Sequence, residues 1–210
     1  MGKQDRKEFK EALKDLKVDF ARAVQDKKRW IYSLIEIAII VVIILADYLT
    51  KKYIYGHCLN EGDIILIKDV LRFTAVENTG ASFGIFKDKT TLLTIISSIC
   101  SLFLVIFIFY SYPRRNKLLR IALIMITGGA IGNIIDRIAL GYVRDFVYFE
   151  LIDFAVFNVA DSFLTVGTIL LLIYVIFFFG KEEEKLNKEK LAKQISAVEE
   201  TAINDSAKEE

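Results

Sequence analysis

Apolar residues in this chain fall into four blocks of about twenty residues, which polar segments separate. The blocks cover about 30–50, 90–111, 118–138 and 156–179. Each has roughly the length that a helix needs to cross a hydrocarbon core ~30 Å thick. The pattern predicts an all-α polytopic membrane protein, in which four transmembrane helices form a bundle.

The membrane domain is predicted to cover residues 30–180, with a charged segment on either side of it. Residues 1–29 carry apolar positions along one helical face, which is typical of an amphipathic helix at a membrane surface or against a partner. A solvated helical extension fits the same pattern equally well. The segment has no small-residue cleavage site, so we do not expect a cleavable signal peptide. Residues 181–210 are a polar run of Lys and Glu, and we expect a charged cytoplasmic tail.

The distribution of basic residues predicts the orientation in the membrane. They precede the first block and separate the second from the third, at Lys27, Lys28, Arg29, Arg114, Arg115, Lys117 and Arg120. Cytoplasmic loops are enriched in Lys and Arg, so these segments are predicted to be cytoplasmic, and both termini with them. Segments 52–89 and 139–155 are then extracytoplasmic, and both are predicted to be outer β segments. Both are rich in β-branched and aromatic residues, and within them 63–67, 71–76 and 142–149 are expected to form a small β-sheet on the outer face.

Acidic residues lie where three of the helices reach the outer surface. The three clusters are Asp47, Thr50 and Lys51; Asn133, Asp136 and Arg137; and Asn158, Asp161 and Thr165. Each cluster lies on one face of its helix, and the predicted topology places all three at one depth. A carboxylate within a membrane costs at least ~2.5–3.5 kcal/mol and needs a partner or a wet cavity.

A structural interpretation of these acids competes with a functional one. Asp136 with Arg137, and Asp47 with Lys51, are spaced to form ion pairs that fix helix ends. Asp161 has no basic neighbour within two turns and is the stronger functional candidate. Gly128, Gly129 and Gly132 form a small-residue face that allows close helix packing.

Other kinds of catalytic chemistry fit the composition poorly. The chain has one histidine, which excludes a zinc site built on paired imidazoles. A thiol nucleophile at Cys58 would need its sequence neighbour His57 as base, and adjacent side chains rarely point at one another. No lysine lies within the second helix, whose serines would otherwise suggest a Ser–Lys pair.

Five segments in order, across residues 30–180, closely resemble the signature motifs of the lipoprotein signal peptidase (signal peptidase II) family. They are Asp47-Tyr-Leu-Thr-Lys51, Glu77-Asn-Thr-Gly-Ala-Ser-Phe-Gly84, Gly128 to Arg137, Gly141-Tyr-Val-Arg-Asp-Phe146 and Phe157-Asn-Val-Ala-Asp-Ser162. The resemblance implies a membrane aspartic endopeptidase of the bacterial plasma (cell inner) membrane. It also implies the substrate, a lipid-modified prolipoprotein that is cut before its diacylglyceryl-cysteine.

The resemblance assigns the catalytic pair to Asp145 and Asp161, whereas helical spacing alone favours Asp136 with Asp161. The positions that it gives supporting or substrate-positioning roles are Asp47, Lys51, Asn78, Gly80, Asn133, Asp136, Arg137 and Asn158. The chain departs from the family at Arg144, where an apolar residue is common, and at Ser82, where Ala is frequent. On a strand, Arg144 is expected to point away from Asp145.

Two neighbouring carboxyl groups can hydrolyse a peptide bond by activating a water molecule. Ionising both groups is costly, because their like charges repel, so the pair shares one proton. This chemistry requires no metal or cofactor. We expect a monomer in contact with membrane lipids and no nucleic-acid partner, since the basic residues have no clustered face. Two other classes use the same acids: a proton- or ion-coupled transporter or channel subunit, and a structural membrane adaptor.

Overall fold

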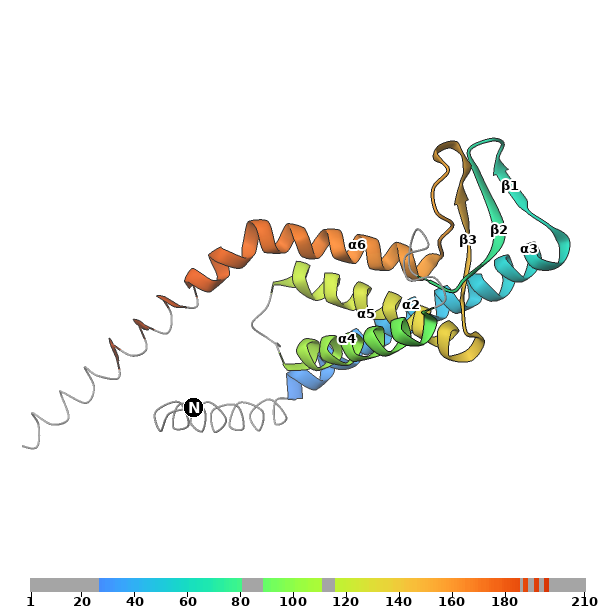
Figure 1. The fold of residues 1–210 in the computed structure, drawn as a ribbon. Coiled ribbons are helices and arrows are strands. Elements are labelled where there is room, and N and C mark those ends of the chain that lie inside the picture. Colours follow the sequence, from blue (N-terminus) through green and yellow to red (C-terminus); the bar gives the residue numbers. More distant parts are fainter. Residues whose placement is uncertain are drawn as a thin grey trace, which may run out of the picture.

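The long helices lie alongside one another in the computed structural model (Figure 1). The structure describes residues 27–80, 89–110 and 116–185, with a few positions between 187 and 196. Within these residues, four helices are long and apolar enough to cross a membrane. They are α2 (Lys27–Thr50), α4 (Thr90–Tyr110), α5 (Lys117–Leu140) and α6 (Val159–Tyr174), which continues as the π-helical segment η4 (Val175–Phe179). The predicted four-helix membrane fold is confirmed.

Helix α5 is the centre of the bundle. More than half of its apolar window is buried, whereas α2, α4 and α6 are buried over less than a quarter of theirs. These outer helices expose large apolar side chains such as Val42 and Phe103. In a membrane protein such side chains face lipid, so packing in the bundle depends on the small residues of α5.

The glycines of α5 bring its backbone against two neighbouring helices. A Cβ atom at Gly128 would meet the side chain of Ile43 at 2.9 Å, and one at Gly129 would meet the backbone oxygen of Ala160 at 2.4 Å. A Cβ atom at Gly132 would lie 2.7 Å from the carboxylate of Asp47. The predicted small-residue face is therefore present, with Gly128 against α2, Gly129 against α6 and Gly132 between both.

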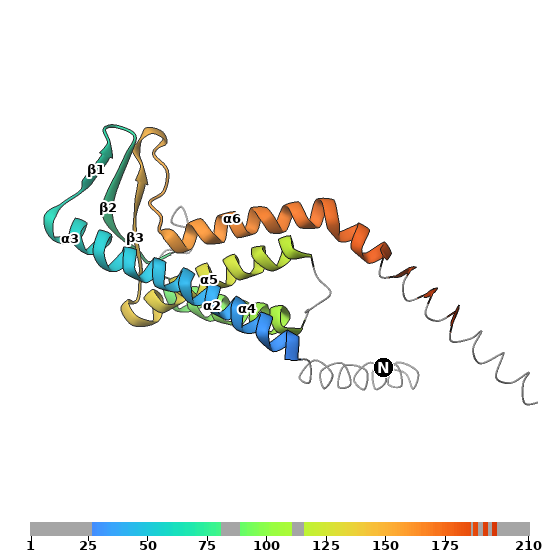
Figure 2. The same cartoon turned by 180° about the vertical axis from the view of Figure 1, so that it is seen from behind.

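A small antiparallel sheet stands with the short helix α3 (Gly56–Glu61) at one end of the bundle (Figures 1 and 2). The described strands are β1 (Ile64–Ile67), β2 (Leu71–Asn78) and β3 (Val143–Phe149), in the order β1-β2-β3. Strand β2 pairs with β3 so that Val76 lies opposite Asp145 and Asn78 opposite Val143. The predicted sheet is confirmed, and its pairing brings a residue of β3 to the ends of the helices.

The prediction that the outer β segment begins at residue 52 is wrong. The chain continues from α2 into the π-helical segment η1 (Lys51–Tyr55) and then into α3. Tyr55 and Cys58, three residues apart, are both buried, so one face of this extension packs as a helix does. The helix ends only at Gly62, whose φ of 100° is left-handed and favours glycine.

The fourth helix begins at Val159 rather than at about 156. Phe157 is extended and exchanges two backbone hydrogen bonds with Val147, at 2.8 and 3.0 Å. Asn158 then caps the helix. The sheet therefore holds the chain extended up to the residue at which α6 starts.

Some predictions fall on residues that lie outside the described parts of the chain. These are the amphipathic helix over most of 1–29, the basic segment 113–115, Ser82, and most of the tail 181–210. Of the tail, residues 181–185 extend the last helix.

Candidate active site

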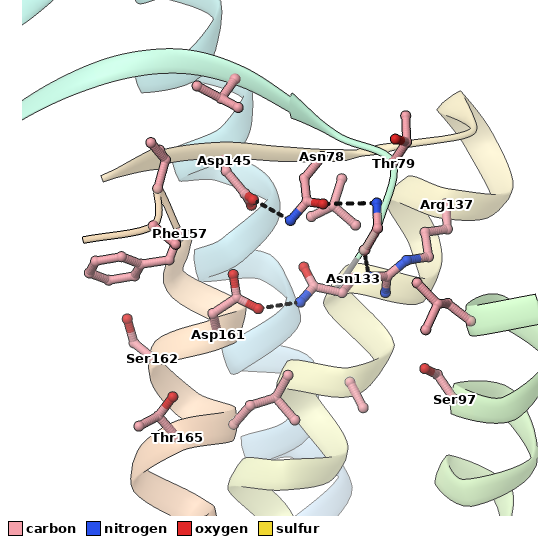
Figure 3. A pocket seen from close by; sticks show the side chains of 18 of the residues that line it. Asn78, Thr79, Ser97, Asn133, Arg137, Asp145, Phe157, Asp161, Ser162 and Thr165 are labelled. Carbon is pink, nitrogen blue, oxygen red and sulfur yellow. Dashed lines mark hydrogen bonds between the residues drawn. The ribbon is translucent and has the colours of Figure 1, made fainter. Parts of the chain in front are cut away.

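A cavity of about 1160 Å³ opens where the sheet meets the adjacent ends of α5 and α6. Its polar lining includes Asn78, Asn133, Arg137, Asp145 and Asp161. Figure 3 shows Asp145 on its strand above Asp161 on its helix, with Asn78 and Asn133 beside them. The cavity is thus the place where segments far apart in the sequence bring polar groups together.

Asp161 is held in the first turn of α6 by three hydrogen bonds. Its backbone N–H donates to Oδ1 of Asn158 at 2.9 Å, and its Oδ2 accepts from the backbone N–H of Asn158 at 3.2 Å, which together form a capping box. Its Oδ1 accepts from Nδ2 of Asn133 at 2.7 Å. Both carboxylate oxygens are therefore fixed by donors, while the side chain still lines the cavity.

Asp145 comes from β3 and is 1% exposed. Its Oδ1 accepts from Nδ2 of Asn158 at 2.6 Å, and its Oδ2 accepts from Nδ2 of Asn78 at 2.9 Å. Burial raises the pKa of Asp145 to about 7, and the negative charge of Asp161 adds to the rise, while the two amide donors oppose it. Asp145 is thus poised to hold or release a proton near neutral pH.

Asn158 connects the two carboxylates. Its side-chain amide donates to Asp145 and its backbone N–H donates to Asp161. The same amide nitrogen also donates to Oδ1 of Asn133 at 3.1 Å. Asn158 is fully buried, so this bridge is shielded from solvent. A single N-cap residue therefore sets the positions of both acids relative to each other.

Asn78 and Gly80 form the turn that follows β2. The backbone N–H of Gly80 donates to Oδ1 of Asn78 at 2.9 Å, and its carbonyl accepts from the guanidinium of Arg137 at 3.1 Å. This turn holds the Asn78 amide against Asp145, and Arg137 fastens the turn to α5.

A second layer of charged groups lies behind the cavity. Nζ of the fully buried Lys51 lies 2.7 Å from Oδ2 of Asp47 and 3.3 Å from Oδ2 of Asp136, and it donates to Oδ1 of Asn133 at 3.0 Å. Oδ1 of Asp47 accepts from the backbone N–H of Ala160 at 2.9 Å. Lys51 therefore connects α2 to α5, and Asp47 connects α2 to the start of α6.

The ion pair expected between Asp136 and Arg137 does not form. Asp136 pairs with Arg144, whose terminal nitrogen lies 2.7 Å from Oδ1, while Arg137 turns to Gly80. The other expected pair, Asp47 with Lys51, is present. Helical spacing did not predict this partner, because Arg144 lies on a strand that folds back across the end of α5. The alternation of side chains along that strand indicates that Arg144 and Asp145 point to different faces of the sheet.

All ten candidate residues occupy this region, in two layers. Those that line the cavity are Asp145, Asp161, Asn78, Gly80, Asn133 and Arg137. Behind them lie Asp47, Lys51, Asp136 and Asn158, each no more than 2% exposed. The three helix ends that carry these residues contact one another at one end of the bundle, and β3 adds a fourth segment.

The alternative nucleophiles are placed differently. Nδ1 of His57 lies 3.4 Å from the carboxylate of Glu61 on α3, while Cys58 is buried. Ser97 lines the cavity, but Lys51 contacts acids and Asn133 rather than this serine. Among the described residues, no group of three or more His, Cys, Asp or Glu is placed to hold a metal ion.

The fold and the site define a class: a polytopic membrane protein with a polar cavity, lined by two aspartates, at one end of its helix bundle. Residues 39–177 match the model of the family described as Signal peptidase (SPase) II. The chain belongs to the signal peptidase II family and is therefore a membrane peptidase.

Known proteins agree with this assignment over most of their length. The chain is 42% identical to the lipoprotein signal peptidase of Clostridium tetani (strain Massachusetts / E88) over 154 residues, which cover 72% of this chain and 98% of the relative. It is 37% identical to that of Clostridioides difficile (strain 630), over 69% of this chain and 97% of the relative. A bacterial membrane enzyme solved by the in meso method at 1.9 Å resolution is similar in structure, with a TM-score of 0.59 and 34% identity over 68% of this chain and 93% of that one.

Proposed function

We propose that this peptidase removes the signal peptide from lipid-modified prolipoproteins, cutting just before the diacylglyceryl-cysteine. Asp145 and Asp161 activate the attacking water. The observation that carries the proposal is that these two carboxylates line one cavity and are both bonded to Asn158.

The chemistry follows from placing two acids in one buried site. Close carboxylates share a proton, because ionising both is costly where water is scarce. The ionised member takes a proton from water, and the protonated member donates a hydrogen bond to the scissile carbonyl. The raised pKa of Asp145 supports a shared proton near neutral pH, and the titration belongs to the pair.

Asp136 is the rival for the second carboxylate, and its surroundings favour a supporting role. Its Oδ1 accepts from Arg144, and its Oδ2 accepts from Arg144 and lies against Lys51. It is 2% exposed and is not part of the cavity lining. An acid with both oxygens held by cations is a poor base for water.

The location of the cavity suits a substrate that is anchored in lipid. The cavity lies at the sheet end of the bundle, and Lys27, Arg29, Lys117 and Arg120 lie at the starts of α2 and α5. By the positive-inside rule the sheet end is extracytoplasmic and both termini are cytoplasmic. Apolar residues such as Ile96 and Leu164 line the membrane side of the cavity and fit acyl chains or an apolar signal helix.

The test is cleavage of a diacylglyceryl-modified precursor by the purified protein, followed by gel shift and by mass of the released product. The wild-type chain should cleave before the modified cysteine and should leave the unmodified precursor intact. Asp145→Asn and Asp161→Asn should each abolish cleavage while leaving the protein folded. Asp153→Asn is the matched control, because Asp153 lies in the turn after β3 and bonds Tyr148 rather than the site.

Two results would contradict the proposal in different ways. Normal cleavage by Asp145→Asn together with loss in Asp136→Asn would move the second catalytic carboxylate to Asp136. Cleavage of lipidated and unmodified precursors at equal rates would refute the substrate assignment and leave a membrane peptidase of other specificity.

A further inference from the structure

Arg144 follows the alternation of β3, so its side chain lies on the face opposite to that of Asp145. On that face it binds the carboxylate of Asp136. The terminal nitrogen of Arg144 donates to Oδ1 of Asp136 at 2.7 Å, and Nε of Arg144 donates to Oδ2 at 3.2 Å. Its backbone N–H adds a third bond to Oδ2 at 3.1 Å. The Arg144 side chain is 17% exposed and that of Asp136 is 3% exposed, so the pair is largely shielded from water.

A short chain of contacts leads from this pair to the two cavity acids. Asp136 contacts Lys51, and Lys51 donates to Oδ1 of Asn133. The Nδ2 of Asn133 then donates to Asp161. Lys51 therefore neutralises Asp47 and Asp136 behind the cavity, and it also orients the side-chain amide of Asn133.

The charges of this buried network come close to balancing. Its described charged members are the acids Asp47, Asp136, Asp145 and Asp161 and the bases Lys51, Arg137 and Arg144. With one proton shared by Asp145 and Asp161, three negative charges face three positive ones. Without Arg144, three negative charges would face two. A second proton on the cavity acids would remove that excess, because buried uncompensated charge is costly.

We propose that Arg144 is a positioning residue that neutralises Asp136, so that Lys51 stays on Asn133 and the Asp145–Asp161 pair holds one proton rather than two at neutral pH. The inference deepens the proposed function and rests on it. A doubly protonated pair has no base for water, so loss of Arg144 removes activity at the acid side of the pH range.

Titratable groups from several elements face Arg144. Asp47 and Tyr48 of α2 and Tyr55 of η1 face it, Glu77 is its partner across β2, and Tyr142 precedes it on the approach to β3. Glu77 is exposed, whereas Asp47 is 1% exposed and pairs with Lys51. The chain's single histidine, His57, faces Glu61 on α3.

The experiment is the pH profile of kcat/KM for the lipidated precursor, measured on the full-length protein. Arg144→Gln should move the acid limb of the pH profile upward by about one pH unit, because the loss of a nearby unit positive charge favours the protonated form of the acids. Asp136→Asn should move it downward, and the double variant should return it toward the wild-type position. Arg144→Lys should keep the limb within a few tenths of a unit of wild type.

Arg72→Gln is the matched control, because Arg72 is an arginine of the same sheet that pairs with Asp63 and Glu150. It lies four residues along β2 from the partner of Asp145, and its loss should leave the limb in place. An unshifted limb in Arg144→Gln overturns the inference. If that variant does not fold, an unshifted or upward limb in Asp136→Asn overturns it. Absence of cleavage by the wild-type protein instead overturns the proposed function.

Discussion

The contact between Gly129 and α6 offers a direct test of how helix packing sets the site. A Cβ atom at position 129 would lie 2.4 Å from the backbone oxygen of Ala160 and 3.0 Å from the side chain of Leu164. Ordinary contact begins at 3.4 Å, so Gly129→Ala must separate α5 from α6 by about 1 Å. The backbone oxygen cannot turn aside as a flexible side chain would.

This displacement acts on the site through Asn133, which lies one turn beyond Gly129 on α5. Asn133 donates to Asp161 on α6 at 2.7 Å, and an added ~1 Å takes that contact beyond hydrogen-bond length. A misplacement of ~1 Å costs on the order of 100-fold in rate. We therefore expect kcat to fall ~10–100-fold, with about 1–3 kcal/mol of stability lost to overpacking.

The assay is the cleavage rate of the lipidated precursor together with the thermal midpoint in one detergent. Gly56→Ala is the control, because a Cβ atom there meets nothing within 4 Å and the residue has helical φ and ψ. It should keep wild-type kcat and gain up to about 1 kcal/mol of stability. Wild-type kcat and midpoint in Gly129→Ala would refute this account of α5 and α6 packing.

Three further predictions concern the cavity acids and the far end of the bundle. The pKa of Asp145 is raised from 3.8 to about 7, so between these pH values the folded state binds a proton that the unfolded state has lost. The stability that this group contributes and kcat/KM should therefore both fall as pH rises through about 7. Profiles of both that are flat from pH 6 to 9 would contradict this prediction. Asn158→Ala removes the cap of α6 and the hydrogen bond to Asp145, and should cost ~1 kcal/mol of stability in a thermal melt and ~100-fold in kcat. A rise in KM with unchanged kcat would argue against this role. Glu36→Gln removes the carboxylate charge that pairs with Arg120, whose side chain is 12% exposed, and should cost about 3 kcal/mol of stability with unchanged kcat per folded molecule. An unchanged melting midpoint would exclude a stabilising role for this pair.

The fold was predictable where the pattern of apolar residues in a segment fits a single kind of secondary structure. The four apolar blocks were long enough that only membrane helices fit, and each observed helix overlaps its predicted block. The strands predicted at 63–67, 71–76 and 142–149 from β-branched and aromatic residues are observed at 64–67, 71–78 and 143–149. Residues 52–61 were included in the outer β segment because their helical face is short, with Tyr55 and Cys58 as its buried residues.

The site was only partly predictable because its geometry depends on strand pairing. Spacing along helices identified Asp136 and Asp161, and both lie at the sheet end of the bundle. It had no means of placing Asp145, which reaches Asn158 only because β3 pairs with β2 and bridges to Phe157. The family resemblance supplied Asp145. The pairing of Arg144 with Asp136 could not be predicted from spacing, because it joins a strand to the end of the preceding helix.

The central claim is that Asp145 and Asp161 act as one unit on a shared water. Its most direct test is the single-turnover cleavage rate of Asp145→Asn, Asp161→Asn and the double variant on a lipidated precursor. Residues that act as a unit give non-additive losses, so each single change should cost at least ~1000-fold, about 4 kcal/mol of barrier, and the double change should cost no more. A tenth or more of wild-type rate in either single variant, or losses that multiply in the double variant, would contradict the claim.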